Sequence, residues 1–198
     1  MSLIVKNTGN SDFVILEAGV YIGTVVSLVD IGEQYSEKYG NYTRNVIISW
    51  ELAGVTVEIN GETKPRIISK EYNMSFNEKA HLRKDLESFR GRKFNNDELS
   101  GFDLRNILNK SCQLQIINLT KGDKVFANIG AIMSLSKGTP APTILSTITF
   151  IDLDDKDSVK QIDTLPKWIA DKIKNSKTYE KNQHLLALDV SDDPDLPF

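Results

Sequence analysis

Arg44-Asn45-Val46-Ile47-Ile48-Ser49-Trp50-Glu51-Leu52 indicates the fold class of this 198-residue chain. Every second side chain from Val46 to Leu52 is large and apolar, which is the period of a β-strand with one buried face. The same parity predicts that Trp50 is a core residue and not a surface on which a ligand stacks. Residues 20–29 alternate in the same way, so a first strand is expected before this second one.

A third strand is expected over residues 66–76. Asn60-Gly61 precedes it and is the strongest two-residue hairpin signal in the chain. Residues 30–43 are rich in tyrosine, glycine and charge, so they are expected as a long polar loop between the first two strands.

A helix should follow the third strand. Ser75 or Asn77 is expected to cap it and Gly91 to end it. A second, shorter helical piece is expected around residues 103–108. The apolar stripe of the first helix consists of Leu82, Leu86 and Phe89.

Two antiparallel strands are expected after the helix, over residues 111–119 and 124–133. Three strands, a helix and two strands follow the order of the five-stranded oligonucleotide-binding (OB) barrel, although other small barrels fit it too. The expected fold class is mainly β: a five-stranded OB-fold barrel with a helix between strands 3 and 4, plus a C-terminal extension with a short helix and an acidic tail. The domains expected are an OB-fold domain (1–136), an extension of linker, strand and short helix (137–178) and a flexible acidic tail (179–198).

The net charge of −3 is divided unevenly along the chain. Residues 1–150 carry 17 Lys/Arg and 16 Asp/Glu (+1), whereas residues 151–198 carry 7 and 11 (−4). A near-neutral body with an acidic end is compatible with a polyanion groove on the body. The single Cys112 excludes an internal disulfide, and the absence of a signal peptide or a membrane-length apolar run predicts a cytoplasmic protein.

Aromatic residues interleaved with cations mark the expected nucleic-acid surface. Bases stack on aromatic rings while Lys and Arg neutralise phosphates, and OB barrels bind through strands 2–3 and the first and last hairpins. Phe126 is expected to point outward because Val125 and Ala127 take the inward face; the alternative is that the aromatics only pack under loops. The expected contacts are Tyr21, Tyr35, Lys38, Tyr39, Tyr42, Arg44, Arg66, Lys70, Tyr72, Lys121, Lys124 and Phe126.

A second basic cluster lies on and after the expected helix. It has few aromatic neighbours, so it is expected to be a solvated helix face, with DNA binding as the alternative. Its members are Arg83, Lys84, Arg90, Arg92 and Lys93.

Catalysis is not expected. The aspartates of residues 152–157 resemble the start of a calcium loop, but they lack its Gly at the sixth and Glu at the twelfth position. They are expected as a solvated loop, and a magnesium nuclease built on them is a weaker hypothesis. No metal site and no cofactor are expected.

The extension and tail carry two further signals. Residues 166–175 predict a short amphipathic helix that starts with proline and has Trp168, Ile169 and Ile173 as apolar residues. The last seven residues form an extended acidic segment with an aromatic ring and a carboxylate at its end, which suits capture by a partner protein; the alternative is a frayed chain end. The expected partner-binding residues are Asp192, Asp193, Asp195, Leu196, Pro197 and Phe198.

Several stretches together suggest a family: Glu17–Tyr21, Arg44–Leu52, Ile68–Tyr72, Glu78–Glu87, Gly101–Leu104, Ala127–Ile129 and Leu165–Ile169. In these the chain resembles the single-stranded DNA-binding proteins of tailed bacteriophages. The resemblance implies an OB fold that coats and protects single-stranded DNA during phage replication, recombination and repair, in the cytoplasm of the infected bacterial host.

The acidic end is similar to the tip with which bacterial single-stranded DNA-binding proteins recruit replication and repair enzymes. The expected partners are therefore single-stranded DNA, replication or recombination proteins and a second copy in a homodimer, with no membrane. The long Gly/Gln-rich linker of many bacterial members is missing, so their tetramer is not carried over. The alternative function is an OB-fold protein–protein adaptor or recombination mediator without DNA affinity.

Overall fold

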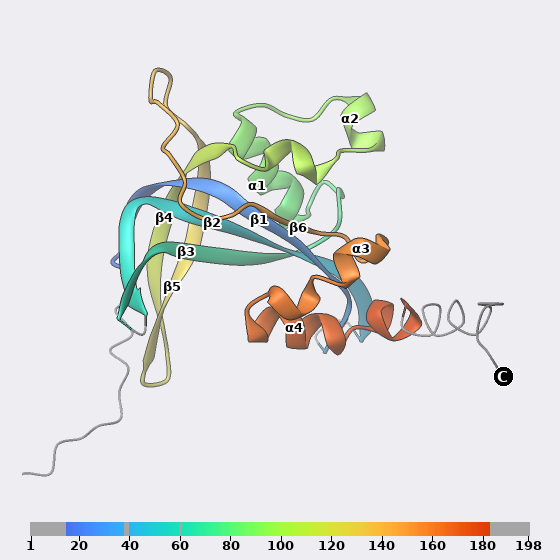
Figure 1. Ribbon diagram of the computed structural model, residues 1–198. Coiled ribbons are helices and arrows are strands. Elements are labelled where there is room, and N and C mark those ends of the chain that lie inside the picture. Colours follow the sequence, from blue (N-terminus) through green and yellow to red (C-terminus); the bar gives the residue numbers. More distant parts are fainter. Residues whose placement is uncertain (1–14, 38–39, 60, 183–198) are drawn as a thin grey trace, which may run out of the picture.

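One β-sheet of six strands forms the body of the protein (Figure 1). The structure, a computed structural model, describes residues 15–37, 40–59 and 61–182. Hydrogen bonds join the strands in the order β3-β2-β1-β4-β5, all antiparallel, and β6 adds to β1 in parallel. The strands are β1 Gly19–Ser36, β2 Asn41–Ile59, β3 Glu62–Asn73, β4 Ser111–Lys121, β5 Lys124–Ser134 and β6 Thr149–Ile151.

The expectation of a mainly β fold is confirmed. In the part of the chain that the structure describes, the sheet is not closed, because β3 and β5 share no ladder of hydrogen bonds. The Asn60-Gly61 hairpin is also confirmed: β2 and β3 pair as far as Ile59 and Glu62, and Gly61 adopts φ +80°.

The expected polar loop over residues 30–43 is wrong for most of its length. β1 continues to Ser36 and β2 resumes at Asn41, with Tyr35 paired to Tyr42. Residues 30–43 are rich in polar side chains, but most of them still pair as strands because the C-terminal extension covers part of one face of β1 and β2. Ile31 is fully buried there by residues of the extension.

The first core lies between the sheet and α1 (His81–Arg90). Trp50, Leu114 and the α1 stripe of Leu82, Leu86 and Phe89 are all buried in it, as the periodicity predicts. Gly91 ends α1 in the left-handed region, also as predicted.

The expected N-caps of α1 are wrong. The helix begins at His81, because the Asn77 side chain accepts a hydrogen bond from the Lys79 backbone in a separate turn ahead of it. The region after α1 holds α2 (Asn96–Ser100), which was not predicted, and the expected short piece, a 3₁₀ helix η1 (Leu104–Ile107).

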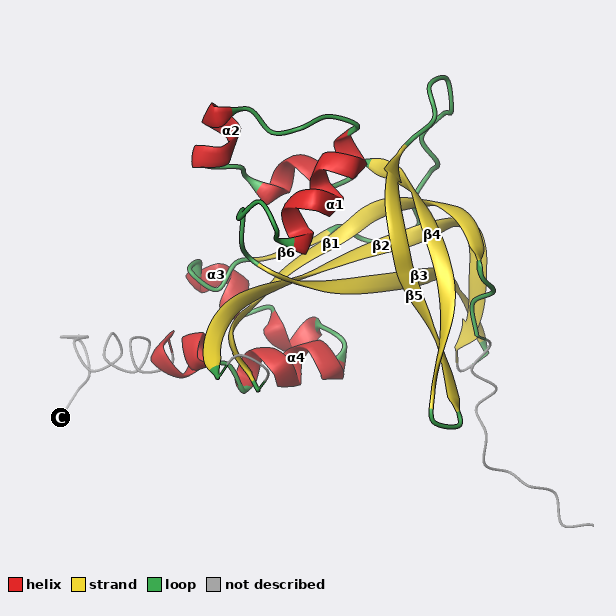
Figure 2. Ribbon diagram, turned by 180° about the vertical axis from the view of Figure 1, so that it is seen from behind, coloured by secondary structure: helices red, strands yellow, loops and turns green. Residues whose placement is uncertain are grey.

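A second core lies on the other face of the sheet. Ile47 points into it, whereas its neighbours Val46 and Ile48 point into the first core, as alternation along β2 requires. The extension supplies the cover through β6 and residues of α3 (Lys156–Val159), η2 (Ile162–Thr164) and α4 (Lys167–Lys174). Figure 2 shows α1 and α4 on opposite sides of the sheet.

Candidate nucleic-acid interface

A groove of about 570 Å³ lies on the outer face of β2 and β3. The β4–β5 hairpin borders it on one side and the N-terminal end of α4 on the other; Figure 1 shows both elements projecting to the same side of the sheet. Its principal lining residues are Ser49, Arg66, Ile67, Ser69, Val125, Phe126, Ala127, Leu165, Pro166 and Trp168.

The floor of the groove is built from small hydroxyl side chains. Ser49 and Ser69 face each other across β2 and β3, with their Oγ atoms 2.8 Å apart. Small side chains leave the floor open to a ligand. Among the described lining residues Arg66 is the one charged side chain, so no carboxylate would repel an anionic ligand inside the groove.

The β4–β5 hairpin supplies an aromatic ring and two cations. Phe126 is 46% exposed, which confirms the predicted outward orientation. The expectation that Val125 points inward is wrong, because this end of the hairpin projects beyond the core and exposes both of its faces. Lys121 and Lys124 face each other at the turn, are exposed, and have no ion pair among the described residues.

Trp168 borders the groove from α4. The buried stripe of α4 is Ile169, Ala170 and Ile173, whereas Trp168 is 51% exposed. The short amphipathic helix predicted here is present, but of its three predicted apolar residues only Ile169 and Ile173 are buried. The i, i+4 spacing of Ile169 and Ile173 is the signal that could have placed Trp168 at the edge of the buried stripe.

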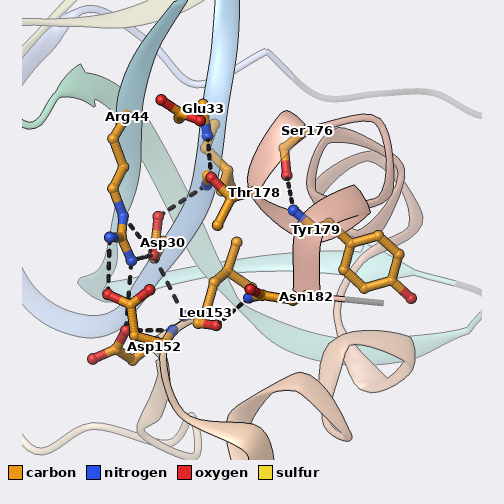
Figure 3. A network of polar contacts seen from close by, with 12 residues as sticks. Asp30, Glu33, Arg44, Asp152, Leu153, Ser176, Thr178, Tyr179 and Asn182 are labelled. Carbon is orange, nitrogen blue, oxygen red and sulfur yellow. Dashed lines mark hydrogen bonds and ion pairs between the residues drawn. The ribbon is translucent and has the colours of Figure 1, made fainter. Parts of the chain in front are cut away.

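Arg44 holds the extension against the sheet. Its guanidinium donates to the buried Asp30 (Nη2 to Oδ2, 2.5 Å) and lies 3.7 Å from Asp152, as Figure 3 shows. It also pairs with Asp154 at 2.9 Å. The hydrogen bond to Asp30 raises the pKa of Arg44 above its ordinary value, although partial burial works against this. Three carboxylates already neutralise Arg44, so it is poorly placed to bind phosphate, and Asp152 and Asp154 are not simply a solvated loop.

Lys70 and Tyr72 lie on the α1 side of β3, away from the groove. Lys70 Nζ contacts Asp85 of α1 at 2.7 Å, and the Tyr72 hydroxyl donates to the same carboxylate at 2.8 Å. Burial, reinforced by the charge of Asp85, raises the pKa of Tyr72. The prediction that Tyr72 is available to DNA is wrong, because its ring belongs to the first core.

The other predicted tyrosines lie outside the groove. Tyr21 packs against the first core and donates to the Glu17 carbonyl at 3.0 Å, as a loop-packing aromatic would. Tyr35 and Tyr42 are exposed and form a tilted ring pair with centroids 5.3 Å apart, near the end of β1 and the start of β2. Lys177 lies over the Tyr42 ring, 4.9 Å from its centroid.

Two sets of predicted residues lie outside the described part of the chain. They are Lys38 and Tyr39 in the β1–β2 connection, and the acidic segment Asp192–Phe198.

The basic cluster on α1 is largely engaged in ion pairs. Arg83 contacts Glu87 at 3.1 Å, while Arg90 and Arg92 both contact Glu98. Arg90 also lies over the rings of Phe94 and Phe102. Arg90 and Arg92 therefore attach α2 to the end of α1, whereas the Arg83 pair lies within α1. The cluster is thus not only the solvated helix face that was expected.

No protein-family model and no curated protein matches this chain. Within the described residues no group of three or more His, Cys, Asp or Glu side chains is arranged to hold a metal ion. The same residues include no helix that is long and apolar enough to cross a membrane.

Proposed function

We propose that this protein binds single-stranded DNA, without strong sequence preference, in the groove between the β4–β5 hairpin and α4. The observation that carries the proposal is a groove with no carboxylate among its described lining residues, with the half-exposed Phe126 on its wall and Lys121 and Lys124 on the hairpin that forms its rim. A stacked base gains roughly 1–3 kcal/mol on an aromatic ring whatever its identity, which gives affinity without sequence preference.

An OB-type architecture is part of the proposal. The strand order and the helix between β3 and β4 support it. α1 spans the space between β3 and β5, the two edge strands that do not pair with each other. Asp85 binds Lys70 of β3, and the Ser88 hydroxyl donates to the Ile132 carbonyl of β5. OB folds bind oligonucleotides through strands 2 and 3 and the neighbouring hairpins, which is where this groove lies.

In this mode of binding the bases face the groove and the phosphates face its rim. Arg66, Lys121 and Lys124 are the cations best placed for phosphate contacts. Three contacts on a single strand predict a slope of log K against log salt of about −2. Tyr35 and Tyr42 are proposed as a second stacking contact, used only by a longer strand.

Fluorescence anisotropy with labelled oligo-dT and a duplex of equal length, at several salt concentrations, tests the proposal. Preferential binding of oligo-dT that weakens with salt is expected. Equal affinity for the two, or affinity that does not change with salt, would overturn the proposal.

The second candidate function is a protein–protein adaptor. Ile67, Val125, Leu165 and Pro166 give the groove an apolar component that also suits a peptide. A protein of this kind would bind neither oligonucleotide in the anisotropy assay.

The acidic segment at residues 192–198 adds a separate part to the proposal. Three carboxylates, two prolines and an aromatic ring support recruitment of replication or recombination proteins. The resemblance to phage single-stranded DNA-binding proteins supports a role in phage DNA metabolism.

A further inference from the structure

We infer that Trp168 is a base-stacking residue, so that the C-terminal extension forms one wall of the single-stranded DNA site. The inference rests on the proposed function and assigns a second platform to the same groove. The ligand of this platform is an unpaired nucleobase, which presents a flat π-face to the indole.

Folding alone does not explain the position of Trp168. α4 attaches to the sheet through Ile169, Ala170 and Ile173, which are buried in the second core. Trp168 adds little to that core, since half of its surface is open, yet it lines the groove. A half-exposed indole that borders a groove is a typical anchor for a flat ligand.

Several contacts fix α4 and therefore the position of the indole. The Gln34 side chain donates to the Lys172 carbonyl at 3.1 Å, and Lys172 Nζ contacts Glu71 of β3 at 2.5 Å. The segment that follows α4 passes close to β1 at Gly32, where a Cβ would lie 2.6 Å from the Ser176 Oγ. A platform held in place before binding loses less conformational freedom when the ligand arrives.

Phe126 and Trp168 together give the groove one aromatic ring on each flank. The two rings come from β5 and α4, on either side of the hydroxyl floor. We expect two bases of one strand to use them, one base at each ring. The extension then contributes directly to DNA binding and does more than join the sheet to the acidic segment.

The two tryptophans of the chain allow a direct test. Trp50 is 1% exposed, so acrylamide should quench mainly the fluorescence of Trp168. Saturating oligo-dT should protect Trp168 from acrylamide, and the protection should be missing in Trp168→Phe. Trp168→Ala should weaken oligo-dT binding about 5- to 150-fold, with Trp168→Phe in between.

Leu145→Ala is the matched control, because Leu145 is more exposed than Trp168 and does not line the groove. Circular dichroism checks that each variant folds; Trp168→Phe carries the affinity test if Trp168→Ala does not. Wild-type affinity in the Trp168 variants, or no protection of Trp168 by oligo-dT, overturns the inference while leaving the proposed function intact. Failure of the wild-type protein to bind oligo-dT overturns both.

Discussion

The effects of Arg44→Ala on protein stability and on oligo-dT binding distinguish a structural role of this arginine from a role in binding DNA. The substitution removes the cation that Asp30, Asp152 and Asp154 share and leaves the other contacts of the extension in place. The Asp30 carboxylate would then be buried with two backbone donors, Gly32 at 2.9 Å and Leu153 at 3.4 Å.

The structure sets the expected loss of stability. Breaking a fully buried ion pair costs about 3–5 kcal/mol, whereas exposed pairs contribute about 0–1 kcal/mol. The Asp30 side chain is 8% exposed but Arg44 is 34% exposed, so solvent screens part of the interaction. We expect a loss of roughly 2 kcal/mol in the free energy of unfolding, which corresponds to about 4–8 °C in Tm for a chain of this size.

Urea unfolding and oligo-dT titrations measure the two roles separately. Arg105→Ala is the control, because Arg105 and its partner Asp103 are both largely exposed and its removal should cost no more than about 0.5 kcal/mol. The salt slope of oligo-dT binding should be the same in Arg44→Ala as in the wild type. Unchanged stability, together with a slope shallower by about 0.7, would show that Arg44 binds phosphate and does not hold the extension against the sheet.

Three further results are expected. Phe126→Ala should weaken oligo-dT binding by about 1–3 kcal/mol in anisotropy titrations, while Leu119→Ala on the same hairpin should not; equal effects would mean that Phe126 does not stack. Hydrogen bonds from Arg92 and, second, from Arg90 lower the pKa of Glu98 from 4.5 to about 2. Because the pKa of Glu98 is lower in the folded than in the unfolded state, the ionised carboxylate stabilises the fold above about pH 4.5. This contribution is lost as the pH falls toward 2. Glu98→Gln should therefore be less stable than wild type at pH 6 and approach it near pH 2 in urea unfolding, and a constant difference would contradict this. Deletion of residues 192–198 should preserve or strengthen oligo-dT binding because it removes three carboxylates, and a deletion variant that no longer binds would refute the proposed separation of roles.

Local patterns in the sequence predicted the elements whose environment depends on near neighbours. Alternation placed Trp50 in the core, and Asn60-Gly61 marked its hairpin. The α1 stripe needed only helical spacing. For Trp50 and the α1 stripe the side-chain direction follows from the backbone period.

The same local patterns gave wrong predictions for residues whose environment depends on contacts between distant parts of the chain. Arg44 resembled a phosphate ligand because its carboxylate partners Asp152 and Asp154 come far later in the sequence. Tyr72 was assigned to the surface because alternation in β3 did not reveal that α1 covers it. The position of Trp168 beside the groove was not predicted, because its helix alone does not show where the β4–β5 hairpin ends.

Photocrosslinking of an oligo-dT that carries 5-iododeoxyuridine reports where the bases lie on the protein. Mass spectrometry of the digested complex should find the label on peptides that contain Phe126 or Trp168, and excess unlabelled oligo-dT should suppress it. Labelling confined to the arginine-rich peptide of residues 81–93, which covers α1 and the start of the following loop, would place the DNA on the opposite face of the sheet and exclude the groove as its binding site.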